Sequence, residues 1–384
     1  MSAPPYGFPG FMPAFDEDGT REFLEKEGFP PGFAELLISQ SEKVAHRFFV
    51  SSWPCYDTDL FSFYSDSNGS PLCLLCSFFL RHLQKILDDS GSMSISDGSK
   101  LYKNPNGTCK QINCSRWDEM VGAMEFHVNL ASKANSATDF RFLNQLAPKR
   151  VGVKEVDPDN THKRAIEKAF DEGPRGLTPL CKHVTDVVNE VTANQGWLRE
   201  NNLTVCVVIV CDGQASDGNL AQAMKPLAHL PVHVVVRLCT SDESVVDYWD
   251  GIDSQLELAL DILDDPIGEA EQIITVNPWL NSAIPIHRMR EFGVKVQEFD
   301  RIDEELLSPG QMKRVLSYLL NCPLRDIPEP QAVWPDFKAF VEDKLKALDL
   351  QYNPATKKME PWINMKQLTA KYAPPGAGGC CSVV

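Results

Sequence analysis

The feature that most constrains the fold is a continuous apolar run, Val205 to Cys211, which ends in Asp212-Gly213. A run with no polar alternation predicts a strand that is buried on both faces of a parallel sheet. Val232 to Leu238 predicts a second buried strand, and amphipathic helical patterns lie between such runs along the chain. This alternation predicts an α/β fold: a doubly wound, mainly parallel sheet with helices on both faces.

Two further segments place side-chain oxygens where strands of this sheet would end. Asp88-Asp89-Ser90-Gly91-Ser92 follows a short apolar segment, so one carboxylate and two hydroxyls can converge on one point. In Gly176-Leu177-Thr178-Pro179, Thr178 is the predicted N-cap of a helix that starts at Pro179. Ligands of open α/β sheets bind beyond the carboxyl ends of strands, and oxygen donors suit a small hard cation. We therefore predict a cation site that is formed by Asp88, Ser90, Ser92, Thr178 and Asp212.

The order of these segments, D-x-S-G-S, then G-x-T-P, then an apolar strand ending in D-G, resembles the von Willebrand factor A-type (VWA) domain with its metal-ion-dependent adhesion site. The resemblance covers roughly residues 40 to 322. It implies a Rossmann-like fold and a bound Mg²⁺, with Mn²⁺ or Ca²⁺ as alternatives. Ser90, Ser92 and Thr178 would hold this ion, while Asp88 and Asp212 would act directly or through water. One open coordination position would take an Asp or Glu carboxylate of a partner protein, which implies a binding module and not an enzyme.

Three alternatives stay open from the residues alone. Each segment could be only a turn or a cap, because Asp, Ser and Gly are common in turns. The chain could be a Mg²⁺-dependent phosphohydrolase with Asp88 as nucleophile, but this needs a general acid and a phosphate-gripping cation, and Ser90-Gly91-Ser92 supplies neither. It could also be a scaffold in which the metal serves only stability.

Charge and cysteine content narrow the class of partner and the cellular compartment. The formal charge of -16 argues against a nucleic-acid partner, because a nucleic-acid surface needs a basic stripe. Residues Met1 to Phe15 lack the basic start and apolar core of a signal peptide, so we predict a cytoplasmic protein with free thiols. Cys206, Cys211 and Cys239 lie in apolar strands and are predicted to be small buried hydrophobes.

Residues 50–84 interrupt the predicted domain. They are rich in Ser, Cys, Phe and Leu, and they lie where the strand leading to Asp88 should run unbroken. One interpretation is a surface insertion, with Leu83 to Leu87 supplying the strand. The other is a translated intron retained in a gene model, because Val50-Ser51 can be encoded by a splice-donor sequence and Gln84 by an acceptor. Removal of this stretch would join Phe49 directly to Lys85.

The remaining pattern divides the chain into a flexible N-terminal extension (1–40), the VWA-like domain (41–322) and a helical C-terminal extension (323–372). The acidic run from Ser241 to Ala283 contains no Lys or Arg and predicts a solvated helix face, with an acidic surface for a basic partner as the alternative. Further predicted strands are Thr138 to Asn144 and Val294 to Phe299. Predicted helices are Thr20 to Lys26, Pro31 to Ser39, one capped by Ser115, His162 to Glu172, Asn219 to Leu230, Ser308 to Leu320, Trp334 to Leu350 and Trp362 to Tyr372.

Residues 373–384 read as a flexible tail with a candidate lipidation site. Cys381 is the fourth residue from the end and resembles a C-a-a-X prenylation site, and Cys380 is a candidate for a second lipid. An unmodified tail is the alternative, because Ser382 is not aliphatic and Val384 is not a usual last residue. One lipid chain anchors weakly, so durable attachment to the cytosolic face of a membrane would need both cysteines.

Overall fold

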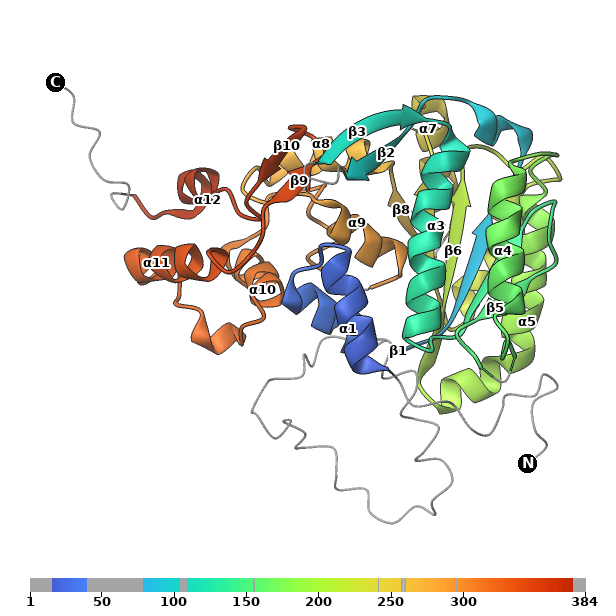
Figure 1. Ribbon diagram of the computed structural model, residues 1–384, viewed down its shortest axis with the longest axis horizontal. Coiled ribbons are helices and arrows are strands. Elements are labelled where there is room, and N and C mark those ends of the chain that lie inside the picture. Colours follow the sequence, from blue (N-terminus) through green and yellow to red (C-terminus); the bar gives the residue numbers. More distant parts are fainter. Residues whose placement is uncertain are drawn as a thin grey trace, which may run out of the picture.

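The computed structural model of the 384-residue chain describes residues 16–39, 79–103, 109–154, 156–240, 242–256, 258, 260–294 and 296–375. Figure 1 shows a central sheet with its flanking helices and, beside it, a group of helices near the C-terminus. We call this second group, residues 16–39 and 264–375, the helical lobe.

The central sheet has six strands in the order β5-β4-β1-β6-β7-β8. Every neighbouring pair is parallel except β4 and β5, which are antiparallel. The predicted α/β class with a mainly parallel sheet is therefore confirmed. The strands are β1 (Phe79–Leu87), β4 (Thr138–Phe142), β5 (Lys149–Val151), β6 (Leu203–Cys211), β7 (Val232–Leu238) and β8 (Leu260–Leu263).

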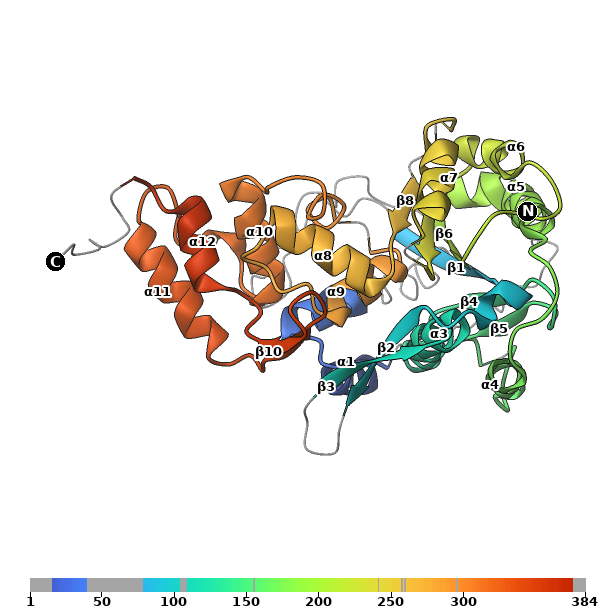
Figure 2. The same ribbon diagram turned by 90° about the horizontal axis from the view of Figure 1, so that it is seen from above.

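Helices cover both faces of the sheet, as Figure 2 shows. The alternation of β4 explains the assignment of faces: Phe140 and Phe142 join the core with residues of α3 and α4, so Asp139 and Arg141 point to the opposite face. On that face Ile209 packs in a second core with residues of α5, α6 and α7. The helices are α3 (Arg116–Lys133), α4 (Thr161–Glu172), α5 (Leu180–Glu200), α6 (Leu220–Met224) and α7 (Glu243–Asp253).

A two-stranded hairpin stands apart from the central sheet, and the sequence pattern did not predict it. It pairs β2 (Gly98–Lys103) with β3 (Cys109–Cys114) and leads into α3. The start of α3 is as predicted: Ser115 forms a capping box with Asp118.

The helical lobe is one packed body with the predicted C-terminal extension inside it. Trp334, Phe337 and Leu368 lie in the same apolar core as Phe299 and Val315, so the boundary predicted at residue 322 does not separate two cores. The helices of the extension do form as predicted in type. The lobe contains α8 (Pro266–Val276), α9 (Ile284–Glu291), α10 (Pro309–Leu319), α11 (Trp334–Leu345) and α12 (Met365–Tyr372), with the short pair β9 (Gln351–Asn353) and β10 (Lys358–Glu360).

Residues 16–39 belong to this lobe, which corrects for this part the prediction of a flexible extension over residues 1–40; residues 1–15 lie outside the described residues. α1 (Glu17–Lys26) and the helical residues 31–39 form where short helices were predicted. The side chains of Leu24, Phe33 and Leu37 are fully buried. The Phe33 ring meets the rings of Phe299 and Trp362 edge-on, with centroids 5.6 Å apart in both pairs. Burial against a lobe so far away in sequence cannot be read from a short amphipathic pattern.

The predicted last strand, Val294 to Phe299, is wrong. The described residues there form turns, and Val294, Val296 and Phe299 are buried in the lobe. The last strand of the sheet is instead β8, which lies inside the acidic run that we read as a solvated helix face. β8 is short, and the buried pairing of its Asp261 with Arg290 (3.0 Å) is a tertiary contact that the sequence pattern does not reveal.

Buried polar contacts join the lobe to the sheet. Glu291 of α9 is fully buried and accepts hydrogen bonds from Arg237 of β7 (3.1 Å) and His127 of α3 (3.2 Å). Lys85 of β1 donates to the backbone oxygen of Glu291 (3.1 Å). These contacts cross from β1, β7 and α3 to α9, so they fix the lobe against the face of the sheet that α3 covers.

The predicted insertion at 50–84 lies mostly outside the described residues. Its last part supplies the start of β1, which runs from Phe79 to Leu87 and so includes Leu83 to Leu87. The retained-intron hypothesis stays a prediction. In the part of the chain that the structure describes, we find no helix that is both long and apolar enough to cross a membrane.

Candidate metal centre

The predicted metal site lies at the switch point of the sheet. β1 and β6 are neighbours, the strand order reverses between them, and Asp88 and Asp212 are the first residues after these strands. The backbone N–H of Asp88 donates to the oxygen of Val210 (2.9 Å), which aligns the two strand ends. Only 1% of Asp88 and 3% of Asp212 is exposed. Open α/β sheets bind ligands at this kind of position.

Hydrogen bonds connect four of the five predicted ligands. The hydroxyls of Ser90 and Ser92 lie 3.0 Å apart, and Ser92 Oγ donates to Asp212 Oδ1 (3.0 Å). The N–H of Ser90 donates to Asp88 Oδ1 (2.9 Å). Ser90 is the N-cap of a 3₁₀ helix, η1 (Gly91–Ser94), but its hydroxyl makes no capping bond. The sequence motif therefore folds into a compact set of oxygen atoms.

Thr178 lies on a loop that is tied to the loop of Asp88. Gly91 N donates to Gly176 O (3.1 Å), and Arg175 N donates to the backbone oxygen of Asp89 (2.6 Å). Gly176 has a φ of +93°, and a Cβ there would lie 2.6 Å from the side chain of Asn144, so this close approach requires glycine. The Thr178 hydroxyl forms no hydrogen bond with the described residues. It is therefore free to take a ligand.

The predicted capping role of Thr178 is wrong. The N-cap of α5 is Pro179, which has a non-helical ψ of 56° and offers no capping side chain. The helix therefore starts one residue later than predicted, and Asp217 caps it from the next loop. Its two oxygens accept from the N–H groups of Cys181 (3.0 Å) and Lys182 (2.9 Å). Free N–H groups at a helix start need such partners.

Asp88 has the charge environment of a cation ligand. Its Oδ2 atom is buried and has no hydrogen-bond partner among the described residues. Burial, with the nearby carboxylates of Asp212 and Asp89, raises the pKa of Asp88 to about 7. An unpaired buried carboxylate is costly, so a cation bound at Oδ2 would both supply the absent partner and remove the repulsion.

Asp89, its neighbour in the motif, has a structural role. Its oxygens accept from the N–H and the side-chain amide of Asn144 (2.9 Å each) and from the N–H of Gln145 (2.9 Å). These bonds hold the end of β4 against the loop that follows β1. Asp89 therefore positions the candidate ligands, and its oxygens are already committed.

Arg116 is a charged neighbour of the site that the sequence did not reveal. Its Nη1 donates to Asp212 Oδ2 (3.0 Å), while Nε and Nη2 donate to the two oxygens of Asp97 (2.7 and 2.6 Å). The guanidinium lowers the pKa of Asp97. The capping box of Ser115 predicts where the helix starts, but no local signal shows that its first side chain turns toward Asp212.

These donors fit Mg²⁺ better than a softer metal. Mg²⁺ prefers oxygen ligands, and the set offers two carboxylates and three hydroxyls. Across the described ranges, no group of three or more His, Cys, Asp or Glu side chains is placed to hold a metal ion. The candidate centre is not a group of this kind, because three of its five ligand side chains are hydroxyls.

The remaining predictions concern cysteines, of which some lie in the described residues and some do not. Cys380 and Cys381 lie outside the described residues, so their lipidation stays a prediction. Cys206, Cys211 and Cys239 are free thiols and fully buried, as predicted.

Comparison with known proteins adds no assignment to this geometry. No protein-family model matches the chain, and no curated protein matches it either.

Proposed function

We propose that this chain is a Mg²⁺-dependent protein-interaction module of the VWA type. In this proposal Asp88, Ser90, Ser92, Thr178 and Asp212 hold Mg²⁺, and a carboxylate of the partner completes its coordination. The observation that carries the proposal is the buried Asp88 Oδ2 without a partner, at the switch point and beside two serine hydroxyls and a second carboxylate.

The strand order supports the same family. Numbered within the central sheet alone, β5-β4-β1-β6-β7-β8 is the order 3-2-1-4-5-6, in which two halves wind away from a central switch point. Fold alone does not carry a function, so the proposal rests on the site.

Two exposed apolar side chains on the loops of the site indicate which residues would flank the carboxylate in the partner protein. Leu177 is next to Thr178 and is 72% exposed, and Ile95 follows η1 and is 48% exposed. Both belong to loops that carry candidate ligands. We therefore propose that the partner presents an Asp or Glu flanked by apolar residues, because desolvated apolar contacts around a charged contact strengthen an interface.

The phosphohydrolase alternative has less support. It needs a cation that can grip a phosphate, and the guanidinium nearest to Asp212 is that of Arg116, which is bound on both sides by carboxylates. We propose a non-enzymatic role and place the module in the cytoplasm. Lipids on Cys381 and Cys380 would tether it to the cytosolic face of a membrane, and the mass of the C-terminal peptide from native protein tests this directly.

The first test is calorimetric titration of Mg²⁺ into the full chain and into Asp212→Ala and Asp88→Asn. We expect one site in the wild-type chain and a loss of at least about a hundredfold in affinity in both variants, because each removes an anionic ligand. Asp186→Asn, a change of an exposed carboxylate that pairs with Lys182, is the matched control and should bind normally.

The second test uses a synthetic peptide with one Asp between leucines and its Asn counterpart. Binding of the Asp peptide in Mg²⁺ but not in EDTA supports the proposal, as does failure of the Asn peptide. Absence of Mg²⁺ binding by the wild-type chain refutes the metal site. Phosphate release from p-nitrophenyl phosphate that disappears in Asp88→Asn would favour the enzyme instead.

A further inference from the structure

A second site lies on the face of the sheet that carries α5, away from the metal centre. It is a cavity of about 310 Å³ between the flank of α5 and the part of the sheet formed by β4 and β5. Residues that line it include Asp139 near the start of β4, Val205 near the start of β6 and Leu198 near the end of α5. The metal centre lies beyond the opposite ends of these parallel strands.

The cavity exists because the alternation of β4 puts charged residues on the α5 face, in a part of it that lies beside the second apolar core. Phe140 and Phe142 fill the core under α3 and α4, whereas Asp139 and Arg141 face the α5 side. There α5 packs on the apolar residues of β1 and β6, such as Ile86 and others of that core. The cavity occupies the corner beside α5.

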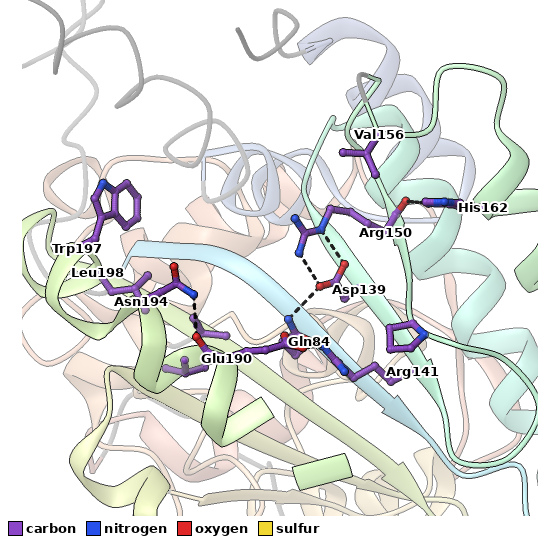
Figure 3. Close-up of a pocket in the computed structure, with 13 residues that line it drawn as sticks. Gln84, Asp139, Arg141, Arg150, Val156, His162, Glu190, Asn194, Trp197 and Leu198 are labelled. Atoms are coloured by element: carbon purple, nitrogen blue, oxygen red, sulfur yellow. Dashed lines mark hydrogen bonds and ion pairs between the residues drawn. The ribbon is translucent and has the colours of Figure 1, made fainter. Parts of the chain in front are cut away.

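The floor of the cavity is a chain of paired charges, which Figure 3 shows. Arg150 donates to both oxygens of Asp139 (2.8 Å each), and Gln84 donates to Asp139 (3.0 Å). Arg141 donates from Nε to Gln84 (2.7 Å) and from Nη2 to the two oxygens of Glu190 (2.5 and 2.6 Å). The two guanidiniums are matched by two carboxylates, so the described lining carries no net charge in a chain of formal charge -16.

One donor and one acceptor of this chain remain open to the cavity. Arg141 is 4% exposed, and its Nη1 has no hydrogen-bond partner among the described residues. Glu190 is bound only on one side, and 40% of its side chain is exposed. A fixed cation and an adaptable carboxylate therefore lie side by side in direct contact.

Most of the remaining wall is apolar, with Asn194 and His162 as its polar members. Val191, Leu198 and Val205 are buried side chains at the α5 side, and the Trp197 ring stands at the same end of the pocket. Small-molecule sites typically combine an apolar lining of this kind with a few polar groups that fix orientation.

We infer that this cavity binds a free α-amino acid with an apolar side chain. A net ion would unbalance the floor, while a zwitterion keeps it neutral. The ammonium and carboxylate of an α-amino acid are attached to one carbon, so they are spaced like the two halves of a contacting ion pair. The carboxylate would accept from Arg141 Nη1, the ammonium would donate to Glu190, and the side chain would contact Trp197 and Leu198.

The test is calorimetry on the full chain with L-leucine, L-phenylalanine and L-tryptophan, up to about 10 mM ligand. N-acetyl-L-phenylalanine, which lacks the ammonium, and L-phenylalaninamide, which lacks the carboxylate, are the matched ligands. We expect at least one amino acid to bind and the blocked forms of phenylalanine to bind at least about tenfold more weakly. Absence of binding by all three amino acids, or equal binding of the blocked forms, overturns the inference.

Variants assign the binding to this cavity. Glu190→Gln keeps the size of the side chain and should weaken amino-acid binding about tenfold, while Asp186→Asn, one turn earlier on α5, should not change it. Trp197→Ala, at a half-buried position, should weaken the binding of phenylalanine and tryptophan by a larger factor than it weakens the binding of leucine. Unchanged affinity in both Glu190→Gln and Trp197→Ala places the ligand elsewhere and refutes the assignment.

Discussion

At one end of the central sheet, the described residues place one guanidinium against the two carboxylates of Asp88 and Asp212: Arg116 pairs with Asp212, and Asp97 also binds it. In the cavity beside α5, Asp139 and Glu190 each have a guanidinium of their own. Within the described residues, the first cluster contains a buried carboxylate oxygen without a partner, and the charges of the second cluster sum to zero. Both clusters lie on the same sheet. They differ in whether cationic side chains of the protein neutralise the carboxylates.

This difference indicates which cluster depends on a ligand. A cluster with excess negative charge gains stability when a cation binds, because burial makes unpaired charge costly. A cluster whose charges sum to zero is stable without a ligand, so a molecule that binds there must itself carry no net charge. The predictions below test this contrast in order of expected effect.

The largest effect should come from breaking the balanced cluster. Asp139→Ala removes the buried acceptor that Arg150 and Gln84 share, so we expect a loss of about 3 kcal/mol in the free energy of unfolding. Asp88→Ala should cost much less in EDTA, because it removes a carboxylate whose Oδ2 has no partner among the described residues and breaks only the bond from the N–H of Ser90 to Oδ1. Urea denaturation of both variants in EDTA measures the contrast, and equal losses would contradict it.

The pH dependence of stability should be the next largest effect. The pKa of Asp88 is about 7 in the folded chain and 3.8 as the ordinary value, so the folded state binds this proton more tightly than the unfolded state. The resulting stability is present below about pH 4 and is lost as pH rises toward 7. Melting curves in EDTA should show this decline in the wild-type chain. Asp88→Asn should remove that part of it, and saturating Mg²⁺ should do so too.

Changes at Arg116 and Asp97 should shift Mg²⁺ affinity in opposite directions. Arg116→Met removes a cation next to Asp212, so we expect about tenfold tighter Mg²⁺ binding. Asp97→Asn leaves Arg116 with a single carboxylate partner, Asp212, which should weaken Mg²⁺ binding by a similar factor. Calorimetry measures both, and shifts of the same sign would show that the guanidinium does not act through charge.

Deletion of residues 50–84 should affect ligand binding at the two sites differently. All five candidate metal ligands follow Lys85, so Mg²⁺ affinity should not change. Phe49 would replace Gln84, whose hydrogen bonds to Asp139 and Arg141 help to order the cavity floor, so amino-acid binding should weaken about tenfold. Titration of both ligands into the shortened chain tests this, with the full chain as reference. Lost Mg²⁺ binding would mean that the segment supports the metal end.

The smallest effect should follow from the cap at α5. Asp217→Ala removes the acceptor for two N–H groups at the helix start, so we expect a loss of about 1 kcal/mol in the free energy of unfolding. Asp217→Asn keeps an acceptor and should cost less. Thermal melting resolves the pair, and an unchanged melting temperature in Asp217→Ala would show that solvent satisfies these groups equally well.

The sequence by itself determined the elements whose signals are local. The apolar run of β6, the alternation of β4 and the capping box of Ser115 each predict an element within a short window, because side-chain period and turn chemistry depend on near neighbours. The motif spacing also brought Asp88 and Asp212 to the ends of adjacent strands.

Only the tertiary structure decided which distant residues complete these local pieces. The pairing of Arg116 with Asp212, the Asp217 cap of α5 and the burial of Phe33 in the helical lobe all join residues that are far apart in the chain. The β8 strand, which lies inside an acidic run, also depends on contacts with residues that are far apart in the chain. Such contacts depend on how the layers pack, and a local period carries no information about which charge or ring lies across the interface.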